Sequence, residues 1–216
     1  MFSNLFGKNK KDDPLANAPS IMGLGMRGSF KIDPLLMKLT EEELITQGAA
    51  STHIIEAAGI VDLDGTWIYR FYTDDEAFLQ VIAKGGQSEE NVIDVKLFHF
   101  YDTLDVSSQS SWDHLLKEEI GVATYELAGH SYDRVWAAAG DYHNPVHMAE
   151  KTYDEEGNFS VTDQFTMLFE RPISNGNTES LFLSAEEKEE ESGNLSRCLV
   201  QSTGITLTAS QLTIFG

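Results

Sequence analysis

Two histidines and two carboxylic acids lie close together in one short segment of the chain. They are Asp141, His143, His147 and Glu150. Imidazole and carboxylate groups are common ligands of zinc and iron, so these four residues are candidate metal ligands. Pro145 disfavours a helix that would place both histidines on one face, and on a strand their rings would lie about 13 Å apart. The segment offers a His/carboxylate pocket for a metal, a small ligand or an enzyme without defining a metal site.

Three further patterns do not meet the structural requirements of the chemistry they resemble. Gly23–Gly28 matches GxGxxG, but a proline-containing segment precedes it and the strand-like Ser29–Ile32 follows, so no helix would meet a phosphate. Cys198, the single cysteine, lies in an apolar stretch, which favours a buried thiol over a nucleophile. The acidic segment 154–191 lacks the EF-hand spacing and indicates solvated charge. We assign no catalytic residue and no cofactor, and the sequence favours a protein without catalytic activity.

The start of the chain combines apolar and basic side chains at near-helical spacing. Such a combination suits weak, reversible contact with an anionic membrane surface or with a groove on a partner protein. A tail without fixed structure, or one that folds back on the rest of the chain, is the alternative. The residues of this interaction arm are Phe2, Leu5, Phe6, Lys8, Lys10 and Lys11.

The charge of the chain is unevenly distributed. Lys and Arg number 15 against 35 Asp and Glu, which gives a net charge of −20. The first 40 residues hold six basic and three acidic residues, a balance of +3 that leaves −23 on the remainder. Because phosphate contacts require Lys and Arg, the acidic residues after position 40 make a nucleic-acid partner unexpected. A further alternative is that this negative surface mimics nucleic acid and occupies a basic partner protein.

The sequence predicts mostly β-strands as the elements that position these candidate residues. Residues 53–63 and 66–73 flank Asp64-Gly65, a dipeptide typical of a tight hairpin turn. In the second run Trp67, Tyr69 and Phe71 share one face, and residues 68 and 70 share the other. Further strands are predicted at 78–83, 92–101, 123–128, 132–138, 146–153, 159–171, 180–185, 197–203 and 212–215.

Short helices interrupt the strands at three places. Asp33-Pro34 predicts an N-cap followed by a helix through residue 39. Thr40 with Glu43 fits a capping box, which predicts a second helix over 41–47. The apolar spacing from Trp112 to Ile120 predicts an amphipathic helix, with a serine at 110 or 111 as its cap.

These elements predict an α+β fold, predominantly an antiparallel β-sheet with one to three short helices. A weak similarity between residues 62–73 and 154–165 makes a pseudo-duplicated β-fold the alternative. The predicted domains are a flexible arm at 1–22 and a single globular domain at 23–216, or two packed halves at about 23–121 and 122–216. One cysteine and no signal-peptide pattern predict the cytoplasm, with the arm allowing a position at the inner membrane.

Three stretches carry a resemblance to a known family. They are residues 150–157 continuing through 162–171, residues 23–36, and Ser202-Thr203-Gly204 near the end. Together they resemble the YjfK-like family of uncharacterised bacterial proteins, a domain of unknown function. The resemblance implies no established activity and no catalytic residues. Genes of this family tend to lie near those for a phage-shock-type membrane-associated protein, a small membrane protein and an ATP-grasp ligase. That neighbourhood implies a cytoplasmic accessory to an envelope or stress system.

The leading hypothesis is therefore a non-enzymatic protein that binds a protein partner in an envelope or membrane-stress system. A small-ligand-binding or metal-binding protein, or an enzyme, is the alternative.

Overall fold

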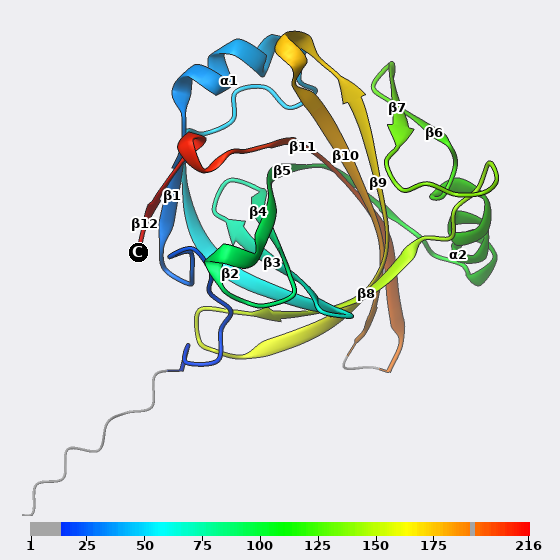
Figure 1. Cartoon of the computed structure of the whole chain (residues 1–216). Coiled ribbons are helices and arrows are strands. Elements are labelled where there is room, and N and C mark those ends of the chain that lie inside the picture. The colour runs from blue at the N-terminus through cyan, green and yellow to red at the C-terminus, as the bar shows by residue number, and fades with distance from the viewer. Residues whose placement is uncertain (1–13, 191–192) are drawn as a thin grey trace, which may run out of the picture.

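A closed antiparallel barrel forms the centre of the computed structural model, which describes residues 14–190 and 193–216. Eight strands make the wall in the order β2-β3-β4-β5-β11-β10-β9-β8, and β8 pairs with both β9 and β2 to close it. Figure 1 looks along the axis of this barrel. The strands are β2 (Thr52–Leu63), β3 (Thr66–Thr73), β4 (Ala77–Lys84), β5 (Val92–Asp105), β8 (Val146–Tyr153), β9 (Phe159–Pro172), β10 (Thr178–Glu189) and β11 (Leu195–Thr206).

Alternation along each strand gives one set of side chains to the lumen and the other to the outside of the wall. On β3, Tyr69 and Phe71 face outward into a buried apolar cluster, whereas Arg70 and Tyr72 line the interior cavity. The predicted face shared by residues 67, 69 and 71 is therefore the outer face. The turn Asp64-Gly65 joins β2 to β3 as predicted, with positive φ angles of 50° and 83°.

One outer layer covers the side of the barrel formed by β2 to β5. It consists of β1 (Ser29–Ile32), α1 (Pro34–Thr40), the 3-10 turn η1 (Glu41–Glu43) and β12 (Leu212–Phe215). Phe30, Leu24 and Ile21 pack from this layer into one apolar cluster with Phe71 and Leu79 of the wall. Ile21 is only 5% exposed, so the packed layer begins before the predicted boundary at residue 22.

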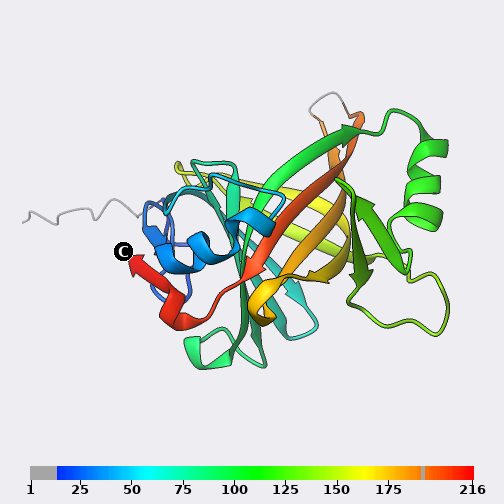
Figure 2. The same ribbon diagram turned by 90° about the horizontal axis from the view of Figure 1, so that it is seen from above.

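A second outer layer covers the opposite side, and Figure 2 shows the two layers at the two ends of the molecule. It contains α2 (Gln109–His114), the π-helical turn η3 (Leu115–Glu119), β6 (Thr124–Leu127) and β7 (His130–Arg134). Trp112, Leu115 and Tyr132 pack here against Phe169 and Leu183 on the outer face of the barrel. Apolar core therefore lies between the barrel wall and each of its two covers, and a further part lies inside the barrel.

The helix predictions are confirmed in part. Asp33 caps α1 by accepting a hydrogen bond from the Leu35 amide at 2.9 Å. The one or two helical turns predicted over 41–47 are reduced to one 3-10 turn at Glu41–Glu43, and the Thr40 hydroxyl donates to the Leu36 carbonyl instead of capping that turn. The amphipathic helix from residue 112 is confirmed, but its cap is Ser108 rather than the serine at 110 or 111.

The predicted predominance of antiparallel sheet with short helices is confirmed, and the sheet closes into a barrel. Strands before and after residue 121 pair directly at three places, β1 with β12, β2 with β8 and β5 with β11. The two halves therefore share one wall, and a pseudo-duplicated fold is not seen. The remaining short turns are η2 (Glu89–Asn91), η4 (Ser174–Gly176) and η5 (Ala209–Gln211).

Within the described ranges, 14–190 and 193–216, no helix has the length and apolar character needed to cross a membrane.

Glu179 on β10 ties both outer layers to the barrel. Its Oε2 accepts hydrogen bonds from the Tyr132 hydroxyl at 2.6 Å and from Arg171 Nε at 2.7 Å. Its Oε1 accepts one from the Ile45 amide at 2.8 Å, in the segment that follows η1. The Arg171 guanidinium also donates to the Glu43 carbonyl. The carboxylate is only 1% exposed, so its charge depends on these partners.

Replacing Glu179 with alanine is expected to lower the free energy of unfolding by about 3–5 kcal/mol, because Arg171 loses its buried counter-ion. Chemical denaturation followed by circular dichroism measures the change. Glu187→Ala on the same strand is the matched control, since Glu187 pairs with Arg197 at a partly exposed position and should cost about 1 kcal/mol or less. Equal losses in the two variants would contradict a special role for Glu179.

Candidate functional site

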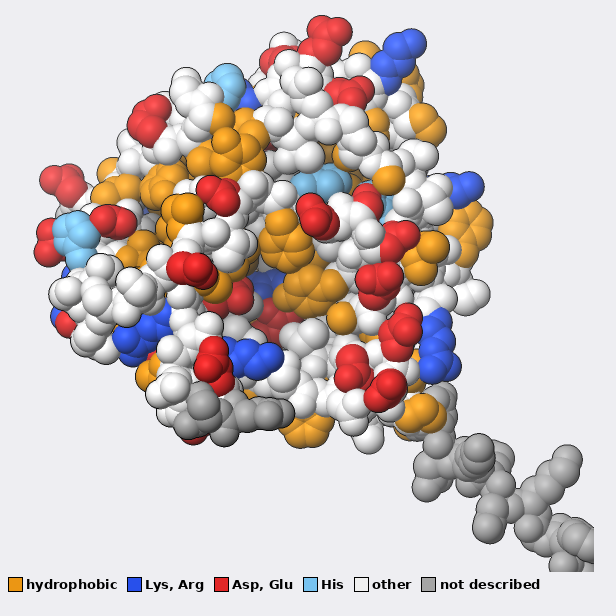
Figure 3. All heavy atoms as spheres, turned by 180° about the vertical axis from the view of Figure 1, so that it is seen from behind, with side chains coloured by type: hydrophobic (Ala, Val, Ile, Leu, Met, Phe, Trp, Pro, Cys, Tyr) orange, Lys and Arg blue, Asp and Glu red, His pale blue; other side chains and the backbone are white. Residues whose placement is uncertain are grey.

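A cavity of about 210 Å³ lies inside the barrel and opens on one face. Figure 3 shows a hollow in the middle of that face, with charged side chains at its depth and apolar side chains around them. Seven of the eight barrel strands, all except β2, contribute residues to its lining. The lining residues are Arg70, Tyr72, Phe78, Phe100, Glu150, Thr152, Thr162, Gln164, Phe182, Ser184, Glu186, Val200 and Ser202.

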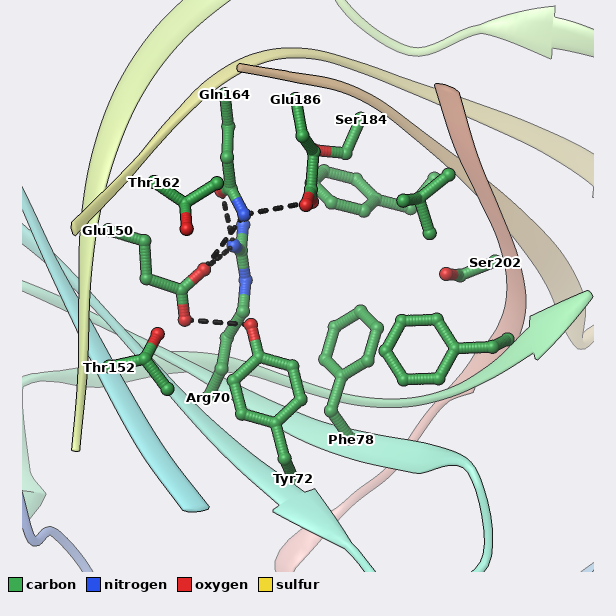
Figure 4. Close-up of a pocket in the computed structure, with 13 residues that line it drawn as sticks. Arg70, Tyr72, Phe78, Glu150, Thr152, Thr162, Gln164, Ser184, Glu186 and Ser202 are labelled. Atoms are coloured by element: carbon green, nitrogen blue, oxygen red, sulfur yellow. Dashed lines mark hydrogen bonds and ion pairs between the residues drawn. The ribbon is translucent and has the colours of Figure 1, made fainter. Parts of the chain in front are cut away.

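Arg70 occupies the centre of the barrel and is 1% exposed. Its Nη1 donates to Glu150 at 2.5 Å and to Gln164 at 2.6 Å, and its Nε donates to Gln80 at 3.0 Å. The guanidinium also lies 5.1 Å from the centre of the Phe182 ring. One side chain from β3 thereby contacts β4, β8, β9 and β10 across the lumen, as Figure 4 shows for the residues it labels.

Glu150 is the counter-ion of Arg70 and is also 1% exposed. Its Oε2 accepts from Arg70 and from Gln164 Nε2 at 3.0 Å, and its Oε1 accepts from the Tyr72 hydroxyl at 2.8 Å. The space for this carboxylate comes from Gly59 on β2, where a Cβ atom would overlap the Glu150 side chain. The carboxylate is thus held by three donors and a glycine opposite it.

The burial of this cluster shifts its pKa values. Burial disfavours the charged form of Arg70, but Glu150 and Tyr72 together more than offset it, so the pKa of Arg70 is raised. Burial, together with the negative charge of Glu150, raises the pKa of Tyr72 well above its ordinary value. The guanidinium therefore keeps its charge and the Tyr72 hydroxyl keeps its proton at neutral pH.

A second carboxylate, Glu186 on β10, faces the same cavity. Its Oε1 accepts from Gln164 Nε2 at 3.1 Å and from the Ser184 hydroxyl at 3.0 Å. The Gln164 amide therefore donates to both Glu150 and Glu186 and lies between them. Burial raises the pKa of Glu186, and the charge of Glu150 acts in the same direction.

Aromatic rings and one hydroxyl form the rest of the cavity wall. The Phe78 ring centre lies 5.6 Å from that of Tyr72 and 5.4 Å from that of Phe100, which gives a continuous aromatic surface. Ser202 on β11 is 1% exposed, and its hydroxyl has no hydrogen-bond partner in the part of the chain that the structure describes. A buried hydroxyl without a partner is costly unless another molecule supplies one.

Apolar side chains close the lumen on the other side of Arg70. Val61, Ile68 and Met148 form a buried cluster there, and Trp136 packs against it. Val61, Ile68 and Met148 follow the inward alternation of Gly59, Arg70 and Glu150 on the same strands. The cavity is therefore a pocket with a charged floor rather than a channel.

The structure separates the four residues that the sequence groups together. Glu150 lines the cavity, whereas His147 on the same strand is exposed and lies 2.8 Å from Asp163. Asp141 and His143 lie in the loop before β8, where the Asp141 carbonyl accepts from Arg134 at 3.2 Å. No group of three or more His, Cys, Asp or Glu side chains suited to a metal ion occurs among residues 14–190 and 193–216. Only Glu150 of the four belongs to the site.

The other sequence candidates lie away from the cavity or outside the described residues. Burial raises the pKa of the Cys198 thiol to about 11, so the thiol is protonated at neutral pH. The segment Gly23–Gly28 is followed by β1, as the sequence indicates, and not by a helix. The arm residues Phe2, Leu5, Phe6, Lys8, Lys10 and Lys11 all fall outside the ranges that the structure describes.

Arg70, Gln164, Glu186 and Ser202 are the site residues that sequence reasoning missed. Glu186 begins a run of acidic residues that predicts solvated charge, yet β10 continues through this run to Glu189. Side chains alternate between the two faces of a strand, which places Glu186 on the opposite face from its neighbour Glu187. That alternation was the sequence signal for Glu186. Arg70 carried a similar signal as a lone cation within an aromatic strand.

Comparisons with known proteins agree with the resemblance seen in the sequence. Residues 1–213 match a family described as "Protein of unknown function (DUF2491)". The chain is 27% identical over 218 residues to the "Uncharacterized protein YjfK" of Escherichia coli (strain K12), with 100% of this chain and 98% of that protein covered. No solved structure matches the chain.

The raised pKa of Glu186 predicts a pH dependence of stability. The folded protein holds this proton at pH values where the unfolded chain has released it, so stability falls as pH rises from about 4.5 through the raised pKa. The Glu186→Gln variant should lack the part of the decline in unfolding free energy that this carboxyl causes. It should therefore be more stable than the natural protein at neutral pH. Chemical denaturation across this pH range, with Glu187→Gln as the control, measures the difference. Parallel stability curves for the natural protein and Glu186→Gln would show that the carboxyl is not perturbed.

Proposed function

The chain belongs to the DUF2491 family of proteins of unknown function, and we propose that it is a small-molecule-binding protein whose site is the interior of its barrel. The observation that carries this proposal is a cavity that combines buried charges, an aromatic wall and an unpartnered hydroxyl. Binding sites for small molecules are typically concave and mostly apolar, with a few fixed polar groups.

The barrel itself favours a ligand of limited size. Eight-stranded barrels are wide enough either to be filled by side chains or to hold one small ligand. Here the lumen is filled on one side of Arg70 by the cluster around Ile68 and Met148, and it is open on the other. A cavity of about 210 Å³ is smaller than those that hold drug-sized molecules, which favours a compact ligand.

The charged floor of the cavity is already organised before any ligand arrives. The Arg70–Glu150 pair is bonded to Gln164 and Tyr72, so these groups have lost most of their rotational freedom on folding. Because these side chains are already ordered, a ligand that binds them does not have to order them, and less binding free energy is lost. This arrangement supports recognition, and it corresponds to the alternative hypothesis from the sequence with a different set of residues around Glu150.

The predicted protein partner, the envelope or stress association and the contact with the inner membrane remain predictions from the sequence. The partner and the membrane contact depend on the arm residues 2–11, which lie outside the described residues, and the envelope or stress association depends on the family resemblance.

Ligand binding can be tested with a screen of small fragments observed by saturation-transfer NMR, using the natural protein and a variant with a filled cavity. Val200→Trp places a large ring in the cavity, and Val161→Trp makes the same change at a position that is 50% exposed and absent from the lining. We expect fragments that bind the natural protein and Val161→Trp but not Val200→Trp. A screen without hits, or with the same hits for Val200→Trp, would contradict binding inside the barrel.

A further inference from the structure

The charges that line the cavity do not cancel. Arg70 and Glu150 form one neutral pair, and the burial of Tyr72 keeps its hydroxyl protonated. Glu186 then remains as a carboxylate without a cationic partner of its own among the described lining residues. Its two hydrogen bonds from protein groups both reach Oε1. When Glu186 is ionised, the cavity carries one excess negative charge, and Oε2 accepts no hydrogen bond from the described lining residues.

An anionic ligand would meet unfavourable conditions at this site. The guanidinium of Arg70 already donates to Glu150, Gln164 and Gln80, and its Nη2 lies 3.8 Å from Met148 Sδ, so a ligand carboxylate would compete with these partners. It would also approach the charge of Glu186. Removing a buried counter-ion and adding a like charge each cost free energy. A neutral ligand meets neither cost but leaves the excess charge uncompensated.

A bare metal ion is equally disfavoured between the two carboxylates. The amide nitrogen of Gln164 lies 3.0 Å from Glu150 Oε2 and 3.1 Å from Glu186 Oε1, so hydrogen-bond donors already occupy the space where both oxygens could share an ion. A cation has to approach Glu186 from the cavity side. On that side the described lining offers aromatic rings and neutral hydroxyls, and Glu150, already bonded to Arg70, is its one other carboxylate.

Aromatic faces beside a carboxylate recognise organic cations. The ring faces attract the positive charge, and the same rings pack against the apolar body that carries it. The unpartnered hydroxyl of Ser202 lies in the wall beyond Ser184, toward Phe78, as Figure 4 shows. That hydroxyl offers a hydrogen bond to a polar group at the far end of a ligand whose charge lies at Glu186.

From these observations we infer that the cavity binds a small organic cation, with an ammonium group at Glu186 and an apolar or aromatic body against Tyr72, Phe78 and Phe100. The inference rests on the proposed ligand-binding function and names the class of ligand for the same site.

Three probes of nearly equal shape separate charge from shape. They are 2-phenylethylamine, 2-phenylethanol and phenylacetate, which carry a positive, a neutral and a negative group on the same aromatic body. Isothermal titration calorimetry on the full chain at neutral pH should show the amine binding most tightly. Glu186→Gln should weaken the amine by about 10-fold or more and leave the alcohol nearly unchanged, because only the amine loses a charge partner. Glu187→Gln removes the same charge outside the cavity and should leave the amine affinity as it is.

The outcomes distinguish this inference from the proposed function. Equal or tighter binding of the alcohol or the carboxylate overturns the cation inference and leaves a ligand-binding barrel. Failure of all three probes, when fragments from the NMR screen do bind inside the barrel, overturns it in the same way. An amine affinity that falls equally in Glu186→Gln and Glu187→Gln would assign its binding to general surface charge and also overturn it. A screen without any ligand inside the barrel overturns the proposed function itself.

Discussion

A buried ion pair between Arg70 and Glu150 fixes the interior of this barrel. Neither charge is accessible to water, so each depends on the other and on the amide and hydroxyl groups around them. The partners come from β3, β4, β8 and β9, which means that one guanidinium determines how strands distant in sequence face one another. The same pair divides the lumen into an apolar plug and an open cavity. The proposed site follows from that division.

The polar interior is compatible with stability because the apolar core lies mainly on the outside of the wall. Two covers, one built around β1 and α1 and the other around α2, η3, β6 and β7, pack against opposite sides of the barrel. Glu179 then joins both covers to β10 and β9 through Tyr132 and Arg171. The covers supply the hydrophobic burial that a small lumen with charged groups does not. This leaves the lumen free to keep a cavity and an unpartnered hydroxyl at Ser202.

Local patterns predicted the parts of the fold that depend on local physics. The Asp64-Gly65 turn, the cap at Asp33 and the amphipathic helix from Trp112 each follow from backbone preference or spacing within one element. Barrel closure depends on pairing between β2 and β8, some 90 residues apart, which no local pattern encodes. His147 and Glu150, which the sequence grouped together, lie apart in the structure for a related reason. Three residues along a strand place two side chains on opposite faces, so one enters the cavity and the other meets water.

A double-mutant cycle on Arg70 and Glu150 tests most directly whether this pair organises the interior. The two single variants, Arg70→Met and Glu150→Met, and the double variant are compared by chemical denaturation with folding checked by circular dichroism. Each single change leaves a buried charge without its partner and should lower the free energy of unfolding by about 3–5 kcal/mol. The double variant should lose clearly less than the sum, with a coupling energy of about 2 kcal/mol or more. If the double variant's loss equals the sum of the two single losses to within about 0.5 kcal/mol, the two charges act independently, which would contradict the account.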